Sequence, residues 1–426
     1  MDERLISILP GQELRIECKG PAIAVTLKEG VAEVFGSPLQ LGVQYEFLAG
    51  RRFSLYVPRD TGEAHVSLRG STQDASFKMH YSYLTNFTEL MEFLESQRSE
   101  CARSGARGPR VLVCGPRDTG KTTICKTLVN HAVAFDHGIV YVDADLGRNS
   151  LSVPGCISAV FMDEFIPVDD GFSNAMPLTY WVGGVTFPSE EAAPEDWARV
   201  RTVAQRMHNL IETTVESRPK FSDGGIIVNL PGYDPKEPDA AVTAILTFAS
   251  AFHINMVCII GDNTRMSERL SKALSTSNVG CAFVTREFQG IPSLPSTPVD
   301  ITRRLRSAKV REYFYGAKAS LLQCFRVTVP LAEVALLRID GRNIVRPIDL
   351  QTEAPFYHHC VGAVSHATKE EDIVIKNVAG FVVFLGVNFE MGQVELITPS
   401  PAGLPKKFIL LSSDIRMLTE DVLSAK

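Results

Sequence analysis

The segment "GPRDTGKT", residues 115–122, combines residue types that together bind phosphate groups. It fits the Walker A pattern G-x-x-x-x-G-K-[ST], with an apolar strand-like run before it and a helix-like run after it. In such a loop, backbone N–H groups and the start of the helix face the phosphates, and glycines let the backbone approach closely. Lys121 should reach the β- and γ-phosphates, and Thr122 should ligate Mg²⁺. The pattern therefore predicts a nucleoside triphosphate site.

A second segment supplies the acidic partner that a phosphate loop needs on a neighbouring strand to hold the metal ion. The run "IVYVDADLG", residues 139–147, places Asp143 and Asp145 at the end of an expected strand. We expect Asp145 to hold the metal ion or to act as the base, with Asp143 as the second choice. The alternative is a strand-end aspartate that only caps the following turn.

The elements around these segments follow an α/β pattern. Continuous apolar runs alternate with helical runs, which is typical of a parallel sheet covered on both faces. The expected strands cover residues 110–115, 138–145, 224–230, 254–262 and 280–286, and the clearest helices cover 195–215 and 240–252. We therefore predict an α/β P-loop NTPase domain with helices on both faces of a parallel sheet.

The flanking regions favour β structure. The first eighty or so residues are short alternating runs broken by Gly, Pro or Asp, which predicts a small antiparallel sandwich or barrel. A helix is expected next, because apolar residues recur at helical spacing from Phe87 to Leu94, and it should end at Gly105. Strand patterns return after about residue 317. The predicted domains are an N-terminal β domain at 1–104, the P-loop domain at 105–316 and a mostly β C-terminal domain at 317–426.

The composition is that of an ordinary globular protein. The chain has 426 residues, of which 45% are hydrophobic and 22% charged, and its net charge of −6 excludes a polycation. Any nucleic acid would therefore bind to a local patch. We expect no membrane span, because no run approaches the ~18–20 apolar residues needed, and no N-terminal signal peptide. The nine cysteines contain no CxxC pair and are expected to be free thiols in a reducing compartment.

The motifs argue against a GTPase. A GTPase would carry an N-K-x-D motif for guanine, and the sequence has none. The run "NLPG", which starts at Asn229, resembles a D-x-x-G switch motif but has Asn in place of the metal-linked Asp. The missing motif and this difference weaken the GTPase hypothesis.

Several separated segments resemble the eukaryotic Clp-family polynucleotide 5′-hydroxyl kinases, which include the ATP-binding subunit of the pre-mRNA cleavage and polyadenylation factor. The resemblance spans the whole chain, and its segments occur in the family order. They are "GQELRIE" and "VAEVFG" in the N-terminal part, "GPRDTGKTTICKTLVNHAV" and "YVDADLGRNSLSVPG" in the centre, "VREYFYG" at 310–316, and "LSSDIRML" near the end.

The resemblance implies an ATP-bound central domain with the N-terminal domain closing over the adenine. The family positions for this contact fall on Glu13 and on Arg52, where the family commonly has Lys. From the residues alone, a glutamate at a strand start and an arginine in a turn would both be expected on the solvated surface. The implied ATP-binding set is Glu13, Arg52, Gly115, Asp118, Thr119, Gly120, Lys121, Thr122 and Thr123, with Thr122 and Asp145 as metal ligands.

The sequence departs from the family pattern where phosphate transfer would occur. Active members carry Gln in D-x-G-Q, where this chain has Arg148. They also carry a T-x-G-W clasp; here the clasp is residues 230–233, with Leu230 in place of Thr and with Tyr233, which can still stack on a base. The family lid is rich in arginine, whereas residues 290–300 are rich in proline and have no basic residue. Candidate transfer arginines remain at Arg303 and Arg306.

Two functional hypotheses follow from the resemblance. The first is an ATP-binding component of the nuclear pre-mRNA cleavage and polyadenylation machinery, required for endonucleolytic cleavage before poly(A) addition, with other cleavage-factor subunits and RNA as partners. The second is an RNA 5′-hydroxyl kinase that transfers the ATP γ-phosphate to RNA 5′-OH ends, including those of tRNA splicing exons. In the kinase, Asp145 would be the base, Lys121 and Mg²⁺ would stabilise charge, Arg303 or Arg306 would act from the lid, and Tyr233 would hold the terminal base.

Overall fold

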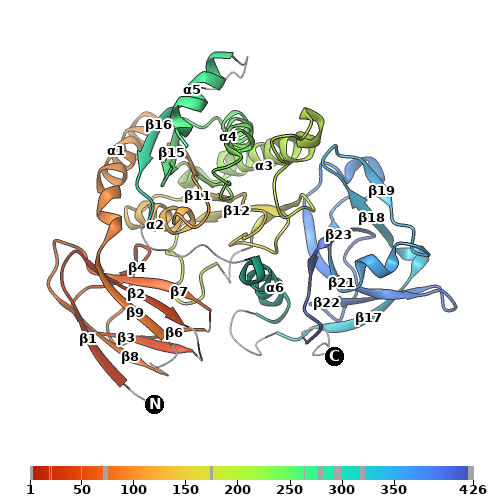
Figure 1. Cartoon of the computed structure of the whole chain (residues 1–426), viewed down its shortest axis with the longest axis horizontal. Helices are drawn as coiled ribbons and strands as arrows, with labels where there is room; N and C mark the ends of the chain where they lie inside the picture. The colour runs from red at the N-terminus through yellow and green to blue at the C-terminus, as the bar shows by residue number, and fades with distance from the viewer. Residues whose placement is uncertain are drawn as a thin grey trace.

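The computed structural model describes residues 3–18, 20, 22–48, 50–70, 75–172, 176–262, 264–276, 282–291, 299–316 and 322–420. An N-terminal sandwich and a C-terminal β-sheet each lie beside a central α/β sheet. Helix α6 (Val299–Tyr315) lies between the sandwich and the C-terminal sheet (Figure 1). None of the helices in these ranges combines the length and the apolar character needed to cross a bilayer. The cysteines in the same ranges are free thiols, as expected.

Two antiparallel sheets form the N-terminal sandwich, one with the strand order β1-β8-β3-β6 and one with β5-β4-β7-β2-β9. Their apolar side chains alternate along the strands and point between the sheets, so that Leu14, Val25, Leu55 and Val66 are buried in one core. The strands are β1 Glu3–Ile8, β2 Gln12–Cys18, β3 Ile23–Glu29, β4 Glu33–Val34, β5 Ser37–Pro38, β6 Gln44–Phe47, β7 Arg52–Tyr56, β8 Ala64–Arg69 and β9 Ala75–Tyr81.

The central sheet has the strand order β13-β12-β11-β14-β10-β15-β16. Five of its strands are parallel, as predicted, but β12 and β13 extend one edge in antiparallel pairing. A parallel pair needs a long crossover, usually helical. No helix separates β11 from β12, so the chain turns back beside its own strand. The strands are β10 Arg110–Cys114, β11 Ile139–Asp143, β12 Cys156–Met162, β13 Leu178–Trp181, β14 Ile226–Asn229, β15 Met256–Ile260 and β16 Val284–Phe288.

Helices cover both faces of this sheet because its strands are apolar on both sides. In β10, Leu112 packs into the core under α3, α4 and α5, whereas Val111 and Val113 pack into the core under α1 and α2 (Figure 1). The helix predicted to end at Gly105 is confirmed, since Gly105 caps it in the left-handed conformation. The helices are α1 Thr88–Ser104, α2 Lys121–Ala134, α3 Ala198–Ser217, α4 Pro238–Phe252 and α5 Met266–Thr276.

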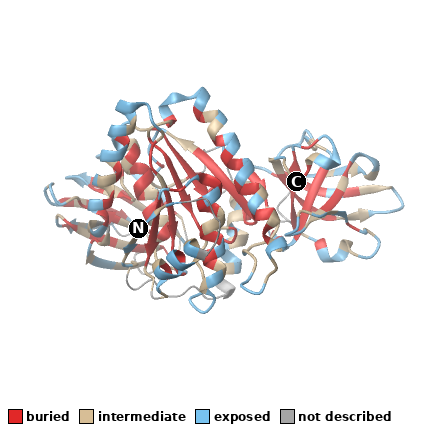
Figure 2. Ribbon diagram, turned by 90° about the horizontal axis from the view of Figure 1, so that it is seen from above, coloured by how far each residue is buried: buried red, intermediate tan, exposed pale blue. Residues whose placement is uncertain are grey.

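The C-terminal sheet has the order β17-β22-β21-β20-β23-β18-β19 and is antiparallel except for the β18–β23 pair. It shares a core with the central part, in which Trp181 of β13 and Phe314 of α6 pack with Phe381. Figure 2 shows the buried residues concentrated along the sheets of both parts. The strands are β17 Phe325–Pro330, β18 Ala335–Ile339, β19 Val345–Pro347, β20 Cys360–Ser365, β21 Val378–Asn388, β22 Gln393–Thr398 and β23 Phe408–Arg416. Short 3-10 helices cover Tyr83–Phe87, Pro194–Trp197, Pro219–Phe221, Leu331–Glu333, Ala354–Tyr357 and Glu370–Asp372.

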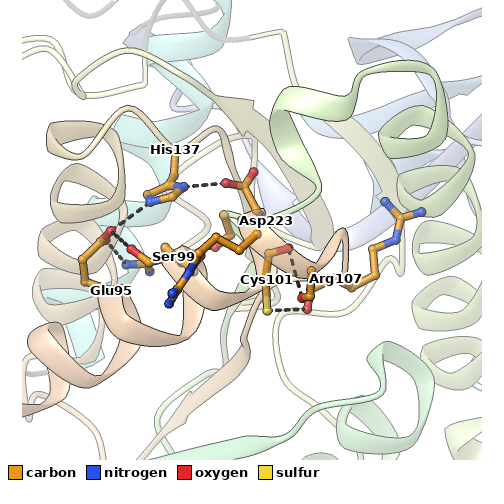
Figure 3. Close-up of polar contacts among 10 residues, drawn as sticks. Glu95, Ser99, Cys101, Arg107, His137 and Asp223 are labelled. Carbon is orange, nitrogen blue, oxygen red and sulfur yellow. Dashed lines mark hydrogen bonds and ion pairs between the residues drawn. The ribbon is translucent and has the colours of Figure 1, made fainter.

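A polar cluster ties α1 to the amino-terminal edge of the parallel strands (Figure 3). The His137 ring lies between two carboxylates, with Nδ1 2.7 Å from Asp223 Oδ2 and Nε2 2.9 Å from Glu95 Oε1. Glu95 belongs to α1, His137 precedes β11 and Asp223 precedes β14. The phosphate loop follows β10 and therefore lies at the carboxyl edge of the parallel strands. The cluster connects α1 to the other edge of the sheet, away from the predicted site.

Candidate nucleotide-binding site

The phosphate loop connects β10 to α2, as the sequence predicted. Gly115 has φ +150°, and a Cβ there would lie 2.1 Å from the Ile260 carbonyl oxygen of the neighbouring strand β15, so no larger residue fits. Asp118 has φ +60° and Gly120 has φ +92°, so the loop curls back before α2 begins at Lys121. The loop thereby presents the start of α2, with its unpaired backbone N–H groups, at the carboxyl edge of the sheet.

Lys121 is the buried cation of this loop, since only 6% of its surface is exposed. Its Nζ donates a hydrogen bond to the Pro116 carbonyl oxygen over 2.5 Å. Burial lowers the pKa of Lys121 to about 8, although the nearby Asp145 carboxylate favours the charged form. A lysine in this state gains strongly from an anion, because an anion would compensate the lost hydration of its charge.

Asp143 and Asp145 have different surroundings, although they are two residues apart. Asp143 is fully buried, and its carboxylate accepts hydrogen bonds from Ser150, Tyr141, Asn229 and the Asp145 backbone. Burial, with repulsion from Asp145 as the next cause, raises the pKa of Asp143. Asp145 instead lines the cavity beside the phosphate loop, which we call the main cavity. Its Oδ1 accepts the N–H groups of residues 147 and 148, each over 3.0 Å. Of these two carboxylates only Asp145 lines the cavity, and its role as metal ligand or base stays a prediction.

Asn229 joins the phosphate loop to the strand that carries these aspartates. Its Nδ2 lies 3.3 Å from Thr122 Oγ1 and 3.1 Å from Asp143 Oδ1, at the end of β14, which runs between β10 and β11. Sequence reasoning treated Asn229 only as an altered switch motif. Its position at the carboxyl end of a strand predicted for the parallel sheet was the signal that could have identified it as a site residue.

The main cavity has a volume of about 480 Å³ and adjoins the loop. The loop side contributes Lys121, Thr122 and Thr123, and the end of β11 contributes Asp145. Much of the remaining lining is apolar and comes from residues 185–188, the clasp at 230–233 and Ala240, Ala241, Ala244 and Ile245 of α4, with Ser189, Asp234 and Glu237 as polar members. The cavity is therefore polar where phosphates would lie and apolar where a nucleobase or other flat group would lie.

The clasp is hydrogen-bonded to the phosphate loop. The Tyr233 N–H donates to the Gly115 carbonyl oxygen and its own carbonyl accepts from the Arg117 N–H, each over 3.3 Å. A Cβ on Gly232 would lie 2.6 Å from the Arg117 Cα, so the approach of these two segments requires glycine. The Tyr233 hydroxyl donates to Asp262 Oδ1 over 2.5 Å, and Tyr233 lines the main cavity. Burial and this hydrogen bond raise the pKa of Tyr233 above its usual value.

The remaining loop residues take separate positions. Gly120 lines the main cavity, and a Cβ on it would lie 2.4 Å from Ile291 Cδ1. The Thr119 hydroxyl donates to the Pro116 carbonyl oxygen over 3.0 Å, and the Thr119 backbone carbonyl oxygen accepts the Ile291 N–H over 3.1 Å. Ile291, at the start of the lid segment, therefore contacts the loop from the end of β16.

The donor set fits a triphosphate with a magnesium ion. The buried Lys121, the start of α2 and the hydroxyl of Thr122 face the same region as the Asp145 carboxylate. An ammonium and free N–H groups suit phosphate oxygens, whereas a hydroxyl and a carboxylate suit Mg²⁺. No group of three or more His, Cys, Asp or Glu residues that could hold a metal ion by itself occurs in the described ranges. The metal ion would therefore depend on phosphate oxygens for part of its coordination.

Comparison with known proteins places the chain in a family. The P-loop model of the mRNA cleavage and polyadenylation factor CLP1 matches residues 115–316. The model of the N-terminal beta-sandwich domain of the polyadenylation factor matches residues 7–101, and that of the pre-mRNA cleavage complex II protein Clp1 matches residues 318–415. The chain is 30% identical over 424 residues to the polyribonucleotide 5′-hydroxyl-kinase Clp1 of Xenopus laevis, and the match covers 95% of this chain and 92% of the relative. The chain belongs to the Clp1 family.

The chain is also similar over its length to other proteins of the Clp1 family. The protein CLP1 homolog of Aedes aegypti is 27% identical over 425 residues, with 95% of each chain covered. The solved structure of a wild-type Clp1p–Pcf11p complex contains a chain that superposes with a TM-score of 0.81 at 20% identity, covering 98% of both chains. This similarity shows that the whole chain has the Clp1 fold.

The two arginines predicted in the Clp1 lid take different positions on α6. Arg306 lines the main cavity, and its Nε is buried without a hydrogen-bond partner among the described residues. Burial lowers the pKa of Arg306, opposed by Asp145 and assisted by Arg148. Arg303 is exposed and does not line the cavity. The structure therefore brings only Arg306 to the site, and a role for Arg303 in transfer stays a prediction.

The two Clp1-family positions in the N-terminal domain do not line the main cavity. Glu13 is buried, 2.6 Å from Arg15 Nε through Oε1 and 3.0 Å from Ser82 Oγ through Oε2. Arg52 forms an ion pair with Glu17 over 2.7 Å and lines a second, smaller cavity of about 60 Å³ between the sandwich and α2. Both residues lie on the face of the sandwich toward the central part, and their contact with adenine stays a prediction.

Proposed function

We propose that the chain is an ATP-binding component of the nuclear pre-mRNA cleavage and polyadenylation machinery and is required for endonucleolytic cleavage before poly(A) addition. The observation that carries this proposal is the phosphate loop, in which the buried Lys121 lies at the start of α2 and beside Asp145. The absence of a guanine-recognition motif from the sequence favours ATP. A bound nucleotide would stabilise the fold in proportion to ln(1 + [L]/Kd).

In this proposal the nucleotide would contact two parts of the chain. Lys121 and the N–H groups at the start of α2 would hold the β- and γ-phosphates, and Thr122 and Asp145 would ligate Mg²⁺, which would neutralise phosphate charge. The N-terminal domain would close over the adenine through Glu13 and Arg52. The working units would be the three domains predicted at 1–104, 105–316 and 317–426.

The proposed partners are the other subunits of the cleavage factor and RNA. A neighbouring solved structure is described as a complex of Clp1p with Pcf11p, and a second one, with a TM-score of 0.78, as giving the interface of these two proteins and the structural basis for ATP loss in a glycine-to-arginine point mutant. Those descriptions concern the neighbouring proteins. They support the proposal that this chain also joins an assembly in the nucleus and carries ATP within it.

A second function, RNA 5′-hydroxyl kinase, is favoured by a separate observation. Asp145, Tyr233 and Arg306 come from three different elements and line the same cavity as Lys121. Asp145 would take the proton from a 5′-OH held near the γ-phosphate, Tyr233 would stack on the terminal base, and Arg306 would stabilise the charge that develops during transfer. Leu230 offers no hydroxyl at the clasp, so this substrate side would depend on stacking.

Two assays on the same purified protein, one of RNA phosphorylation and one of RNA cleavage, distinguish the two functions. The purified full chain, in excess over a labelled 5′-OH RNA oligonucleotide, is incubated with Mg·ATP for hours, and the same protein is added to a cleavage reaction depleted of its endogenous counterpart. A component that only carries ATP restores cleavage, leaves the 5′-OH end unmodified, and depends on Lys121 but not on the charge of Asp145. A kinase phosphorylates the RNA, and Asp145→Asn abolishes that product while leaving ATP bound. Failure to restore cleavage would contradict the first function, and an unmodified RNA with ATP bound would contradict the second.

A further inference from the structure

Arg148 extends from the loop after β11 to the phosphate loop. Its Nη1 lies 2.6 Å from Asp118 Oδ1, and both residues line the main cavity. The side chains of Arg148 and Asp118 are 34% and 15% exposed, so the pair is partly removed from solvent. This ion pair joins the two segments that would lie on either side of a bound triphosphate.

The backbone holds Arg148 in a fixed position relative to Asp145. The Arg148 N–H and the Gly147 N–H both donate to Asp145 Oδ1 over 3.0 Å, which forms a tight turn after β11. Gly147 also leaves room for α6, since a Cβ there would lie 3.3 Å from Arg306 Nη2. The guanidinium of Arg148 is therefore placed three residues beyond the proposed metal ligand, on the same side of the cavity as Arg306.

The carboxylate of Asp118 is unexpected in this loop, because the loop is proposed to bind phosphate, which is also negatively charged. In the left-handed conformation at φ +60°, Asp118 stands two residues before Gly120, in the part of the loop that curls around phosphate. Its negative charge alone would oppose a triphosphate. Arg148 neutralises that charge, and a guanidinium has five N–H donors, so one donor on Asp118 leaves others for a phosphate oxygen.

We propose that Arg148 binds the terminal phosphate of ATP and that Asp118 positions its guanidinium for this contact. Lys121 and the start of α2 would hold the β- and γ-phosphates, and Arg148 lines the same cavity with Asp145 and Arg306, where its remaining guanidinium donors would meet the terminal phosphate. The inference rests on the proposed binding of ATP and adds a residue that distinguishes ATP from ADP. It also gives a function to the arginine that replaces the glutamine of the family pattern.

The test compares Mg·ATP and Mg·ADP affinities by calorimetry, with the full chain stripped of nucleotide. Arg148→Ala should weaken ATP binding about tenfold to a hundredfold, the effect of one hydrogen bond to a charged group, and change ADP binding less than about threefold. Arg148→Lys keeps the positive charge but lacks the several donors of a planar guanidinium. It should therefore lose less ATP affinity than Arg148→Ala, and its ADP affinity should not change. Arg342→Ala breaks a similar ion pair, 2.7 Å from Asp196 and outside the cavity, and should leave both affinities unchanged.

A double variant separates phosphate contact from simple neutralisation of Asp118. If Arg148 contacts the γ-phosphate, Arg148→Ala with Asp118→Asn still binds ATP at least about tenfold more weakly than the wild type. Full recovery of ATP affinity in the double variant, or an equal loss for ATP and ADP in Arg148→Ala, would overturn the inference. A wild-type chain that binds neither nucleotide would overturn the proposed function itself and this inference with it.

Discussion

Raising the pH from 7 to 9 should weaken ATP binding, because the buried Lys121 loses its charge in the free protein. Burial lowers the pKa of Lys121 to about 8, against an ordinary value of 10.5. Phosphate oxygens favour the charged ammonium, so bound ATP raises this pKa again. Between the two values, the complex holds a proton that the free protein lacks, and ATP binding must take up that proton.

The magnitude follows from the free-state pKa of about 8. At pH 7 Lys121 is already about 90% charged, so ATP binding takes up only about 0.1 proton at this residue. At pH 8.5 it is about 25% charged, and the uptake is about 0.8 proton. The affinity should therefore fall about tenfold between pH 7 and pH 9, or about 1.4 kcal/mol.

The assay is calorimetry of Mg·ATP binding at pH 8.5 in buffers with different heats of ionisation, with the Kd measured at pH 7, 8 and 9. A second lysine needs a control, because burial and the nearby Arg51 also lower the pKa of Lys126 to about 8. Lys126→Gln should keep the proton uptake, since Lys126 does not line the main cavity. Zero uptake at pH 8.5, or equal affinities at pH 7 and pH 9, would refute the assignment of Lys121 as a buried phosphate ligand.

Three further outcomes are expected from single substitutions. Asp145→Asn should abolish any RNA phosphorylation in a single-turnover assay, while calorimetry still detects Mg·ATP binding; transfer at the wild-type rate would exclude Asp145 as the base. Tyr233→Ala should weaken RNA binding by about tenfold or more, at ~1–3 kcal/mol per stacked base, and Tyr233→Phe by less, because only the hydroxyl bond to Asp262 is lost. Asn229→Ala should lower the free energy of unfolding by about 1–3 kcal/mol in a urea titration, because it removes a donor from the buried carboxylate of Asp143; an unchanged midpoint would contradict that role.

Local sequence rules predicted the parts of the site that lie within one segment. The glycines, Lys121 and Thr122 of the phosphate loop lie within eight residues between a strand and a helix, so their arrangement follows from the motif. Asp145 was predicted because a strand end is visible in the sequence. The cap at Gly105 was predicted because apolar spacing and glycine together indicate where a helix stops.

Contacts between distant segments were not predictable in the same way. Arg148 and Asp118 are 30 residues apart, and Tyr233 and Asp262 are 29 apart, so only the packing of different strands brings each pair together. Arg303 and Arg306 were equivalent candidates in the sequence, because spacing on α6 alone does not reveal which side chain faces the cavity. The orientation of α6 is set by its packing against the C-terminal sheet, and this packing joins residues that are far apart in the sequence.

The central claim, that this chain carries ATP on its phosphate loop, is tested most directly by the nucleotide content of the purified protein. The full chain is purified without added nucleotide and denatured, and the released nucleotide is identified and quantified by chromatography beside Lys121→Ala prepared in the same way. We expect the ATP content to approach one molecule per chain in the wild type and to be little or none in Lys121→Ala. No nucleotide in the wild type, together with no Mg·ATP binding by calorimetry, or equal ATP in both proteins, would contradict it.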